Sequence, residues 1–213
     1  HLDRLNDWKS GKEIFPLYLE IGPARSCNQR CVHCYVNHIG FDKTILEEGI
    51  FLKLIDDISE VDVRGIQFAG CGEPLLNRSL PKAIQKAYEK NISVALTTNG
   101  VLYNKNLIKD TLGAITWVRY SVLGCSPNTY SLLHQVNAKQ FDLLLRNIRD
   151  AVEVRKEHHY KTNIGVALYF FREVASEVVE FARMLRDMGV DYLQVKCPGY
   201  DARNEYKPER GLG

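Results

Sequence analysis

The amino-acid sequence predicts an α/β protein with a parallel β-sheet, and three observations carry that prediction. Short β-like runs alternate with longer segments of helical periodicity, and this alternation repeats along the chain. The 213 residues, 45% of them apolar and 25% charged, have the composition of one globular domain with a sizeable core. The cysteine-rich and glycine-rich segments follow strands directly. Periodicity alone leaves open whether the βα units form an open doubly wound sheet or a barrel.

Strands and helices can be assigned in order along the chain. The expected strands are 17–21, 65–70, 93–98, 117–123, 163–170 and 192–196. The expected helices are 44–59, 80–89, 104–112, 128–135, 141–156 and 177–188. Gly189 supplies a C-terminal signal for the last helix. In both candidate architectures ligands bind at the carboxyl ends of the strands, so we expect the functional residues there.

The chain divides into a lead-in (1–13), one βα domain (14–197) and a polar tail (198–213) that is either a linker or the start of an extension. A net charge of +2 favours neither nucleic acid nor a membrane surface as partner. No apolar run approaches the ~18 residues that span a bilayer, and the first ten residues are too polar for a secretory signal. Three of the six cysteines are clustered and three isolated, which predicts a cytoplasmic protein with metal-binding or reactive thiols.

The segment CNQRCVHC places Cys27, Cys31 and Cys34 in the loop after the first expected strand. Three thiolates at this spacing favour an iron–sulfur cluster or zinc. A cubane cluster held by three cysteines leaves one iron without a protein ligand, and an open coordination position is typical of a catalytic metal centre. Addition of His38 gives an alternative of another class, a structural zinc module. A simple electron carrier is a further alternative, although ferredoxins use a fourth cysteine.

The C-x3-C-x2-C motif, with GCGEP (70–74) after the second strand, resembles the radical S-adenosylmethionine (radical SAM) enzymes. The resemblance covers roughly residues 14–197 and includes an aromatic-type residue, His33, before the third cysteine. It implies a partial (β/α)6 TIM-like barrel, a 4Fe–4S cluster on the three cysteines, and SAM bound to the unique iron. Such enzymes cleave SAM reductively to a 5′-deoxyadenosyl radical, which abstracts a hydrogen atom from the substrate. An external electron donor such as flavodoxin or ferredoxin is implied as a partner.

The resemblance also implies roles for residues that follow the second and third strands. Glu73 offers a carboxylate to the SAM ammonium group, and Gly72 lets the backbone approach a ligand closely. Cys71 stands where glycine is common in the family, and a plain tight turn is the alternative for this segment. Thr98 and Asn99 are candidates to contact the SAM ribose, in competition with an ordinary Asn-Gly turn.

Three further candidates lie elsewhere in the chain. Ser121 matches the family's serine on the fourth strand, which helps to hold the SAM carboxylate. Many relatives have an acidic residue at the position of Leu123 and an arginine at that of His134. His134 either bonds the same carboxylate or lies on a helix surface. Tyr35 either lies against the adenine or serves packing alone.

Three cysteines stand outside the motif, at or just beyond expected strand ends that face the mouth of the barrel. Cys125 is the candidate hydrogen-atom donor to a substrate radical. Together with Cys71 and Cys197, it could instead ligate an auxiliary iron–sulfur cluster or act as a small buried hydrophobe. Lys196 and Arg172 favour a small-molecule or carbohydrate substrate with a phosphate or carboxylate group, and a peptide substrate is the alternative.

Overall fold

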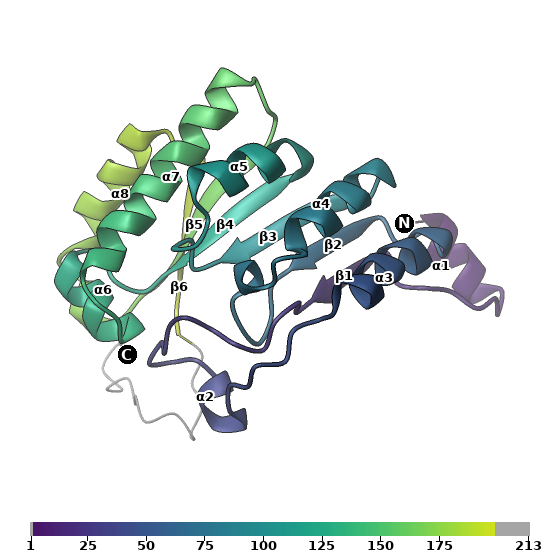
Figure 1. The fold of residues 1–213 in the computed structure, drawn as a ribbon, viewed down its shortest axis with the longest axis horizontal. Helices are drawn as coiled ribbons and strands as arrows, with labels where there is room; N and C mark the ends of the chain where they lie inside the picture. The colour runs from purple at the N-terminus through teal and green to yellow at the C-terminus, as the bar shows by residue number, and fades with distance from the viewer. Residues whose placement is uncertain (1, 199–213) are drawn as a thin grey trace.

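The computed structural model describes residues 2–198, and its centre is a parallel sheet with the strand order β1-β2-β3-β4-β5-β6 (Figure 1). Its strands are Tyr18–Ile21 (β1), Gly65–Phe68 (β2), Ser93–Thr98 (β3), Trp117–Val122 (β4), Asn163–Tyr169 (β5) and Tyr192–Lys196 (β6). Among these strands β1 and β6 do not pair with each other, so the six-stranded sheet stays open. The predicted α/β class and the partial barrel are confirmed.

Most helices connect successive strands. They are α1 (Leu2–Lys9), α2 (Val36–Ile39), α3 (Glu48–Glu60), α4 (Leu80–Glu89), α5 (Lys105–Thr111), α6 (Pro127–His134), α7 (Lys139–Glu157) and α8 (Val178–Met188), with short 3-10 turns η1 (Pro74–Leu76), η2 (Leu112–Ala114) and η3 (Arg172–Val174). The strands lie in the sheet in the order in which they occur along the chain. Right-handed crossovers therefore place the connecting helices on the same face of the sheet each time. This arrangement excludes the doubly wound alternative, which carries helices on both faces.

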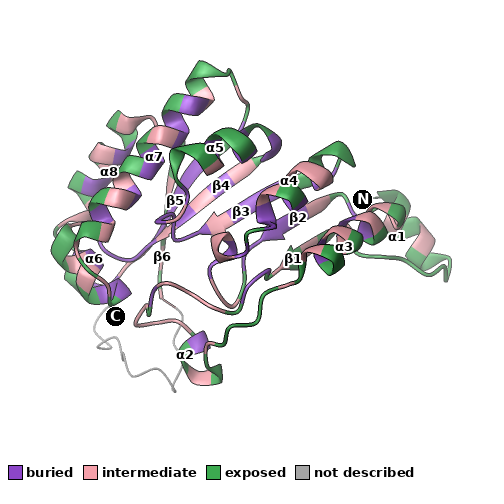
Figure 2. Ribbon diagram, viewed as in Figure 1, coloured by how far each residue is buried: buried purple, intermediate pink, exposed green. Residues whose placement is uncertain are grey.

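The hydrophobic core lies between this helical layer and one face of the sheet (Figure 2). Strand β4 shows the alternation: Val118, Tyr120 and Val122 are buried in the core, whereas the residues between them are partly exposed. We call the sheet face away from the helices the inner face. It carries polar side chains such as Gln67 and Thr97, which hydrogen-bond each other at 3.2 Å between Nε2 and Oγ1.

The helix predicted from Thr44 begins four residues later, at Glu48. Backbone pairing is the physical reason: Ile45 forms an antiparallel bridge with Ala24, and the Leu46 N–H donates to the Pro23 carbonyl (3.0 Å). These long-range bonds override the local helical periodicity. They also bring the segment before α3 beside the chain that leads into the cysteine loop. The other expected helices differ from the observed ones by at most two residues at either end.

The predicted lead-in contains α1, which buries none of its residues. Arg4 attaches it to the rest of the protein, because its guanidinium donates to the Phe15 carbonyl (2.7 Å) and pairs with Asp62 (2.9 Å). Apart from residue 198, the predicted tail lies outside the described residues. None of the helices between residues 2 and 198 combines the length and the apolar character needed to cross a bilayer.

Candidate cofactor site

A cavity of about 470 Å³ opens at the carboxyl ends of the strands. Its walls come from the loop after β1, the turns after β2 and β3, the end of β4, and the end of α6. All predicted site residues except Cys71 and Cys125 line it, namely Cys27, Cys31, Cys34, Tyr35, Gly72, Glu73, Thr98, Asn99, Ser121 and His134. The expectation that the unusual residues meet at the strand ends is therefore confirmed.

The cysteine loop is attached to the C-terminal end of α6. The Arg30 N–H donates to the His134 carbonyl (3.1 Å), and the Val32 N–H donates to the Leu133 carbonyl (3.0 Å). Carbonyls in the last turn of a helix have no partner within the helix, so they are free to accept these bonds. Gln135 ends α6 in a left-handed conformation with φ 53°. The middle of the loop thus takes its position from an element far along the chain.

The His134 ring is buried, and both of its nitrogens contact protein atoms. Nε2 accepts a hydrogen bond from the Leu123 N–H (3.0 Å), so Nδ1 must carry the proton of the neutral ring. Nδ1 lies 2.8 Å from Oε1 of Gln29 and 3.3 Å from Sγ of Cys31. Burial, aided by the nearby His33, lowers the pKa of His134 to about 3. The helix-surface alternative is wrong, and the ring's hydrogen bonds go to the protein.

Gln29 extends this buried network. Its Nε2 donates to the Tyr130 hydroxyl (2.8 Å) and to Oε1 of Gln140 (3.2 Å), which orients Oε1 toward His134. Tyr130 also stacks on the His134 ring at 3.9 Å between centroids. Gln29, a residue that the motif leaves unspecified between its first two cysteines, therefore holds the cysteine loop in place.

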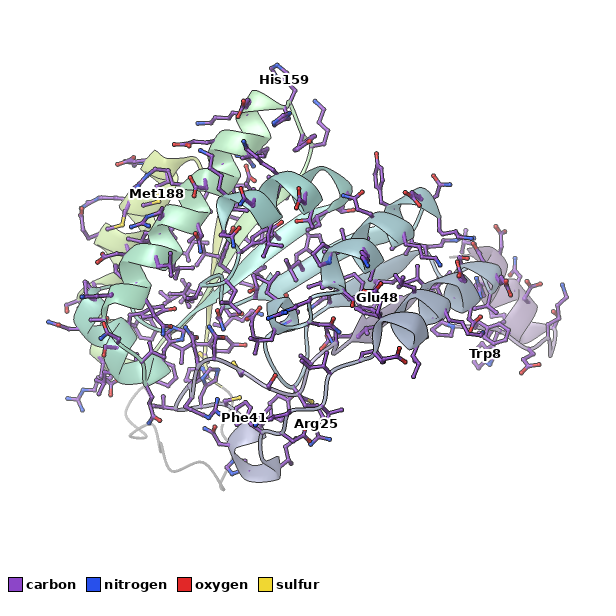
Figure 3. The ribbon with its side chains drawn as sticks, in the orientation of Figure 1. Trp8, Arg25, Phe41, Glu48, His159 and Met188 are labelled. Carbon is purple, nitrogen blue, oxygen red and sulfur yellow. The ribbon has the colours of Figure 1, made fainter. Side chains whose placement is uncertain are left out.

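The outer side of the cysteine loop is covered by the segment after α2. The Arg30 guanidinium lies 4.1 Å from the centre of the Phe41 ring, a cation–π contact, and donates to the Cys27 carbonyl (2.8 Å). Arg25 pairs with Asp42 at 2.9 Å. Figure 3 shows Phe41 and Arg25 close to α2, at the end of the molecule where the loop lies.

The turn GCGEP packs directly on the chain that enters the cysteine loop. A Cβ at Gly72 would overlap the Ser26 carbonyl oxygen and lie 2.5 Å from that of Ala24. Gly70 has φ +112°, and a Cβ there would lie 2.7 Å from Cα of Gly22. These glycines allow close approach between two backbone segments of the site. The segment is a tight turn, as the alternative held, and it also lines the cavity.

Glu73 is buried at the cavity wall with a carboxylate that accepts three hydrogen bonds. Oε1 accepts from the Thr98 hydroxyl (2.6 Å) and the Leu75 N–H (3.1 Å), and Oε2 accepts from the Asn99 N–H (2.8 Å). Burial raises its pKa, and the three hydrogen bonds oppose that shift. Since a carboxylate offers about four acceptor positions, one position on Oε2 remains for a ligand.

Thr98 and Asn99 form a turn and line the cavity as well. The Thr98 hydroxyl, a donor to Glu73, also accepts from the Gly100 N–H (3.0 Å). The Asn99 side chain accepts from the Val101 N–H (3.1 Å) and donates to Oδ1 of Asn28 (2.7 Å) in the cysteine loop. The turn and the site therefore use the same residues.

Ser121 and Tyr35 both line the cavity. Among the described residues no protein group hydrogen-bonds the Ser121 hydroxyl, so it is available to a ligand. The Tyr35 hydroxyl donates to Sγ of Cys71 (3.5 Å), and this hydrogen bond, followed by burial, raises the pKa of Tyr35 to about 12. Cys71 thus contacts Tyr35 and does not itself line the cavity.

The expectation that Cys125 faces the mouth of the barrel is wrong. Cys125 belongs to the hydrophobic core cluster with 6% of its surface exposed, and it does not line the cavity. The physical reason is the capping of α6: the Cys125 N–H donates to the Thr129 hydroxyl (3.0 Å), which turns this loop into the helix start. Cys197 is exposed just beyond β6. Neither cysteine joins the cavity.

A family model described as the radical SAM superfamily matches residues 21–185 of this chain. That range covers β1 to α8 and therefore most of the chain. The chain belongs to the radical SAM superfamily. Enzymes of this family use a 4Fe–4S cluster and SAM.

Two curated relatives extend over most of the chain. The tungsten-containing aldehyde ferredoxin oxidoreductase cofactor-modifying protein of Pyrococcus furiosus is 28% identical over 184 residues, which cover 84% of this chain and 50% of that protein. The GTP 3′,8-cyclase of Desulforamulus reducens is 27% identical over 179 residues, which cover 81% of this chain and 53% of that protein. The chain spans about half the length of these radical SAM relatives.

Among solved structures, Streptococcus suis SuiB bound to S-adenosylmethionine is similar in fold, with a TM-score of 0.74 at 16% identity. The match covers 94% of this chain and 45% of SuiB. A structure of SuiB bound to its precursor peptide SuiA matches with a TM-score of 0.73. At this identity the likeness shows that the radical SAM fold is shared.

The three motif thiols fit the family's cluster better than a zinc ion. Within residues 2–198 no group of three or more His, Cys, Asp or Glu side chains is arranged to hold a single metal ion, so the zinc set completed by His38 is not assembled. A radical SAM cluster distributes its cysteine ligands over several irons, and all three motif thiols line the cavity. Burial raises the pKa of Cys27, Cys31 and Cys34, so cluster binding must displace their protons.

Seven lining residues were not among the predicted site residues: Gln29, His33, Gly70, Pro74, Thr97, Leu123 and Tyr169. Gln29 lies inside the radical SAM motif at a position that the motif leaves variable, His33 fills the motif's aromatic-type position, and the other five end or follow strands. His33 packs as an aromatic residue, 4.4 Å between centroids from Tyr169. Position at a strand end was the available signal for Tyr169. No local signal distinguishes Gln29 from a solvated loop residue.

Proposed function

We propose that this chain is the catalytic domain of a radical SAM enzyme whose Cys27, Cys31 and Cys34 hold the 4Fe–4S cluster. The observation that carries the proposal is the single cavity at the carboxyl ends of the strands, because it brings all three motif thiols together with the residues expected to bind SAM. When bound, the reduced cluster and SAM supply a 5′-deoxyadenosyl radical that abstracts a hydrogen atom from the substrate.

The residues of the cavity have distinct tasks in this proposal. Glu73 holds the SAM ammonium group through the acceptor position left on Oε2, a charge-assisted hydrogen bond. Ser121 donates its hydroxyl to the SAM carboxylate. Tyr35, half exposed at the mouth, covers the adenine. His134 acts indirectly, because its ring nitrogens contact Leu123, Gln29 and Cys31, and it positions the cysteine loop.

The cluster requires an external electron donor, for which a flavodoxin or ferredoxin is suitable. The two curated relatives described above are named for the modification of a cofactor and the cyclisation of GTP, and SuiB binds a precursor peptide. The charged groups described in the next subsection favour a small molecule with an anionic group for this chain. A peptide substrate is the alternative, and it has in its favour the fold shared with SuiB.

Release of 5′-deoxyadenosine tests the proposal. Anaerobically reconstituted protein is mixed with SAM and dithionite, and the products are separated by liquid chromatography. We expect 5′-deoxyadenosine and methionine from the unmodified chain and from Cys125→Ala, but not from Cys34→Ala. No SAM cleavage by a chain that carries a full cluster would overturn the proposal.

A further inference from the structure

The inner face of the sheet carries a guanidinium with few partners. The buried Nε of Arg119 has no hydrogen-bond partner in the described part of the chain, and Nη2 reaches only Oγ1 of Thr97, at 3.4 Å. The guanidinium lies 5.0 Å from the centre of the Trp117 ring. Gly165 is in register with Arg119 on β5, and the ring of Tyr192 crosses the space a side chain would fill there. A cation in this position keeps donors for an anion.

Arg119 adjoins the cofactor cavity through Thr97. Thr97, which it contacts, lines that cavity, and so does Ser121, two residues farther along β4 on the same face. Two residues of a strand advance by about 6.6 Å. The guanidinium therefore lies immediately below the cavity, on the side toward the interior of the partial barrel.

A second cation approaches the same space from β6. Lys196 is in register with Tyr169, which lines the cavity. Between β4 and β6, strand β5 presents the small residues Gly165 and Ala167 to the inner face, and the ring of Tyr192 lies over Gly165. Burial, and then the positive charge of Arg119, lower the pKa of Lys196. Lys196 faces the same side of the sheet as Arg119, four residues farther toward the carboxyl ends of the strands, and the two like charges oppose each other.

Two acidic side chains stand near this space without neutralising it. Glu20 on β1 is exposed and forms no ion pair with any residue between 2 and 198. Glu73 already accepts hydrogen bonds from Thr98, Leu75 and Asn99. Arg119 and Lys196 have no paired carboxylate among residues 2–198, and a bound anion would relieve the repulsion between the two cations.

We propose that Arg119 and Lys196 form a subsite for an oxyanion, a phosphate or carboxylate group of the substrate, beneath the cofactor cavity. This inference depends on the proposed function in one respect, namely that SAM is the molecule bound above the subsite. Arg119 offers a planar set of donors that suits either anion, and Lys196 adds a point charge. The anionic group would hold the rest of the substrate against the cavity floor, where the hydrogen atom is removed.

The two tryptophans of the chain provide a local probe. Trp117 lies beside Arg119, whereas Trp8 is on α1 at the edge of the molecule (Figure 3) and is 62% exposed. The cluster-loaded protein is labelled with 5-fluorotryptophan and titrated with inorganic phosphate, pyrophosphate or succinate at constant ionic strength. The fluorine resonance of Trp117 is followed by NMR, and Trp8→Phe assigns the two signals.

We expect a saturable shift of the Trp117 resonance, while the Trp8 resonance stays in place. Arg119→Gln should weaken binding by roughly tenfold or more, and Lys196→Gln by roughly three- to tenfold. Arg119→Lys should give an intermediate value, and it keeps the test valid if Arg119→Gln fails to fold. Arg183→Gln, a variant of an exposed arginine on α8, serves as the matched control and should bind as the unmodified chain does.

Each outcome decides the proposal. A response to phosphate or pyrophosphate assigns a phosphorylated substrate, and a response to succinate alone assigns a carboxylate substrate. A non-saturable shift, equal binding by Arg119→Gln, or stoichiometric competition by SAM would overturn the substrate subsite. SAM cleavage is measured on the same samples. If the unmodified chain cleaves SAM but does not bind the anions, only the subsite is refuted. If it binds the anions but does not cleave SAM, only the proposed enzyme function is refuted.

Discussion

The Nδ1 atom of His134 lies 3.3 Å from Sγ of Cys31, although the two residues are 103 positions apart in the chain. The neutral His134 ring joins the end of α6 to the middle cysteine, and the backbone bonds of Arg30 and Val32 to α6 carbonyls reinforce this link. The geometry of the cysteine loop therefore depends on an element outside the cysteine motif.

Replacement of His134 by leucine should destabilise the protein. The Leu123 N–H and Oε1 of Gln29 would be left buried without their partner, at a cost of about 2 to 4 kcal/mol in the free energy of unfolding. Urea unfolding measures the loss, and hydrogen exchange of the Leu123 amide localises it. His158→Leu, at an exposed histidine after α7, is the matched control and should change the free energy by less than about 0.5 kcal/mol. Equal effects of the two variants would contradict the network.

Stability should fall as the pH is lowered below the ordinary histidine range. Burial lowers the pKa of His33 to about 4 and of His134 to about 3, from 6.5. At a pH between the folded-state pKa of each histidine and 6.5, the unfolded chain binds a proton that the folded chain excludes. Acid therefore favours unfolding by up to about 1.4 kcal/mol per pH unit for each histidine. Urea midpoints of the metal-free protein at pH 7 and pH 5 measure the slope. His134→Gln should flatten it, and an unchanged slope would show that His134 does not contribute.

The turn after β2 should not tolerate a side chain at Gly72. A methyl group there would overlap the Ser26 carbonyl, so Gly72→Ala should cost about 1 to 3 kcal/mol and lower the iron content after reconstitution. Gly49→Ala is the control, because the nearest atom to its Cβ is a flexible Glu47 oxygen at 3.4 Å. In the first turn of α3 that change should be neutral or stabilising by up to about 1 kcal/mol. Parallel behaviour of the two alanine variants would refute close packing at Gly72.

Cys125 should be dispensable for the chemistry of the cavity. Because it is buried in the core and does not line the cavity, Cys125→Ala should cost about 1 kcal/mol of stability and leave iron content and SAM cleavage unchanged. Cys31→Ala should abolish both. Once a product assay exists, loss of product by Cys125→Ala with intact SAM cleavage would restore its role as hydrogen-atom donor.

The order of strands and the residues at their ends were predictable because local patterns encode them. Strand β3 and helix α4 have the bounds that the sequence predicts. The predicted start of α3 was wrong by four residues. The pairing of Ile45 with Ala24 is a long-range contact, and the periodicity of neighbouring residues does not reveal it. For the same reason the surroundings of His134, set by Gln29 and Cys31, could not be read from its helix.

Metal analysis with electron paramagnetic resonance tests the central claim most directly. After anaerobic reconstitution we expect iron and sulfide in the equal proportion of a 4Fe–4S cluster, and a reduced-cluster signal that changes when SAM is added. Alanine at Cys27, Cys31 or Cys34 should remove the cluster, whereas His38→Ala should retain it. Stoichiometric zinc without iron, released by His38→Ala, would contradict the account.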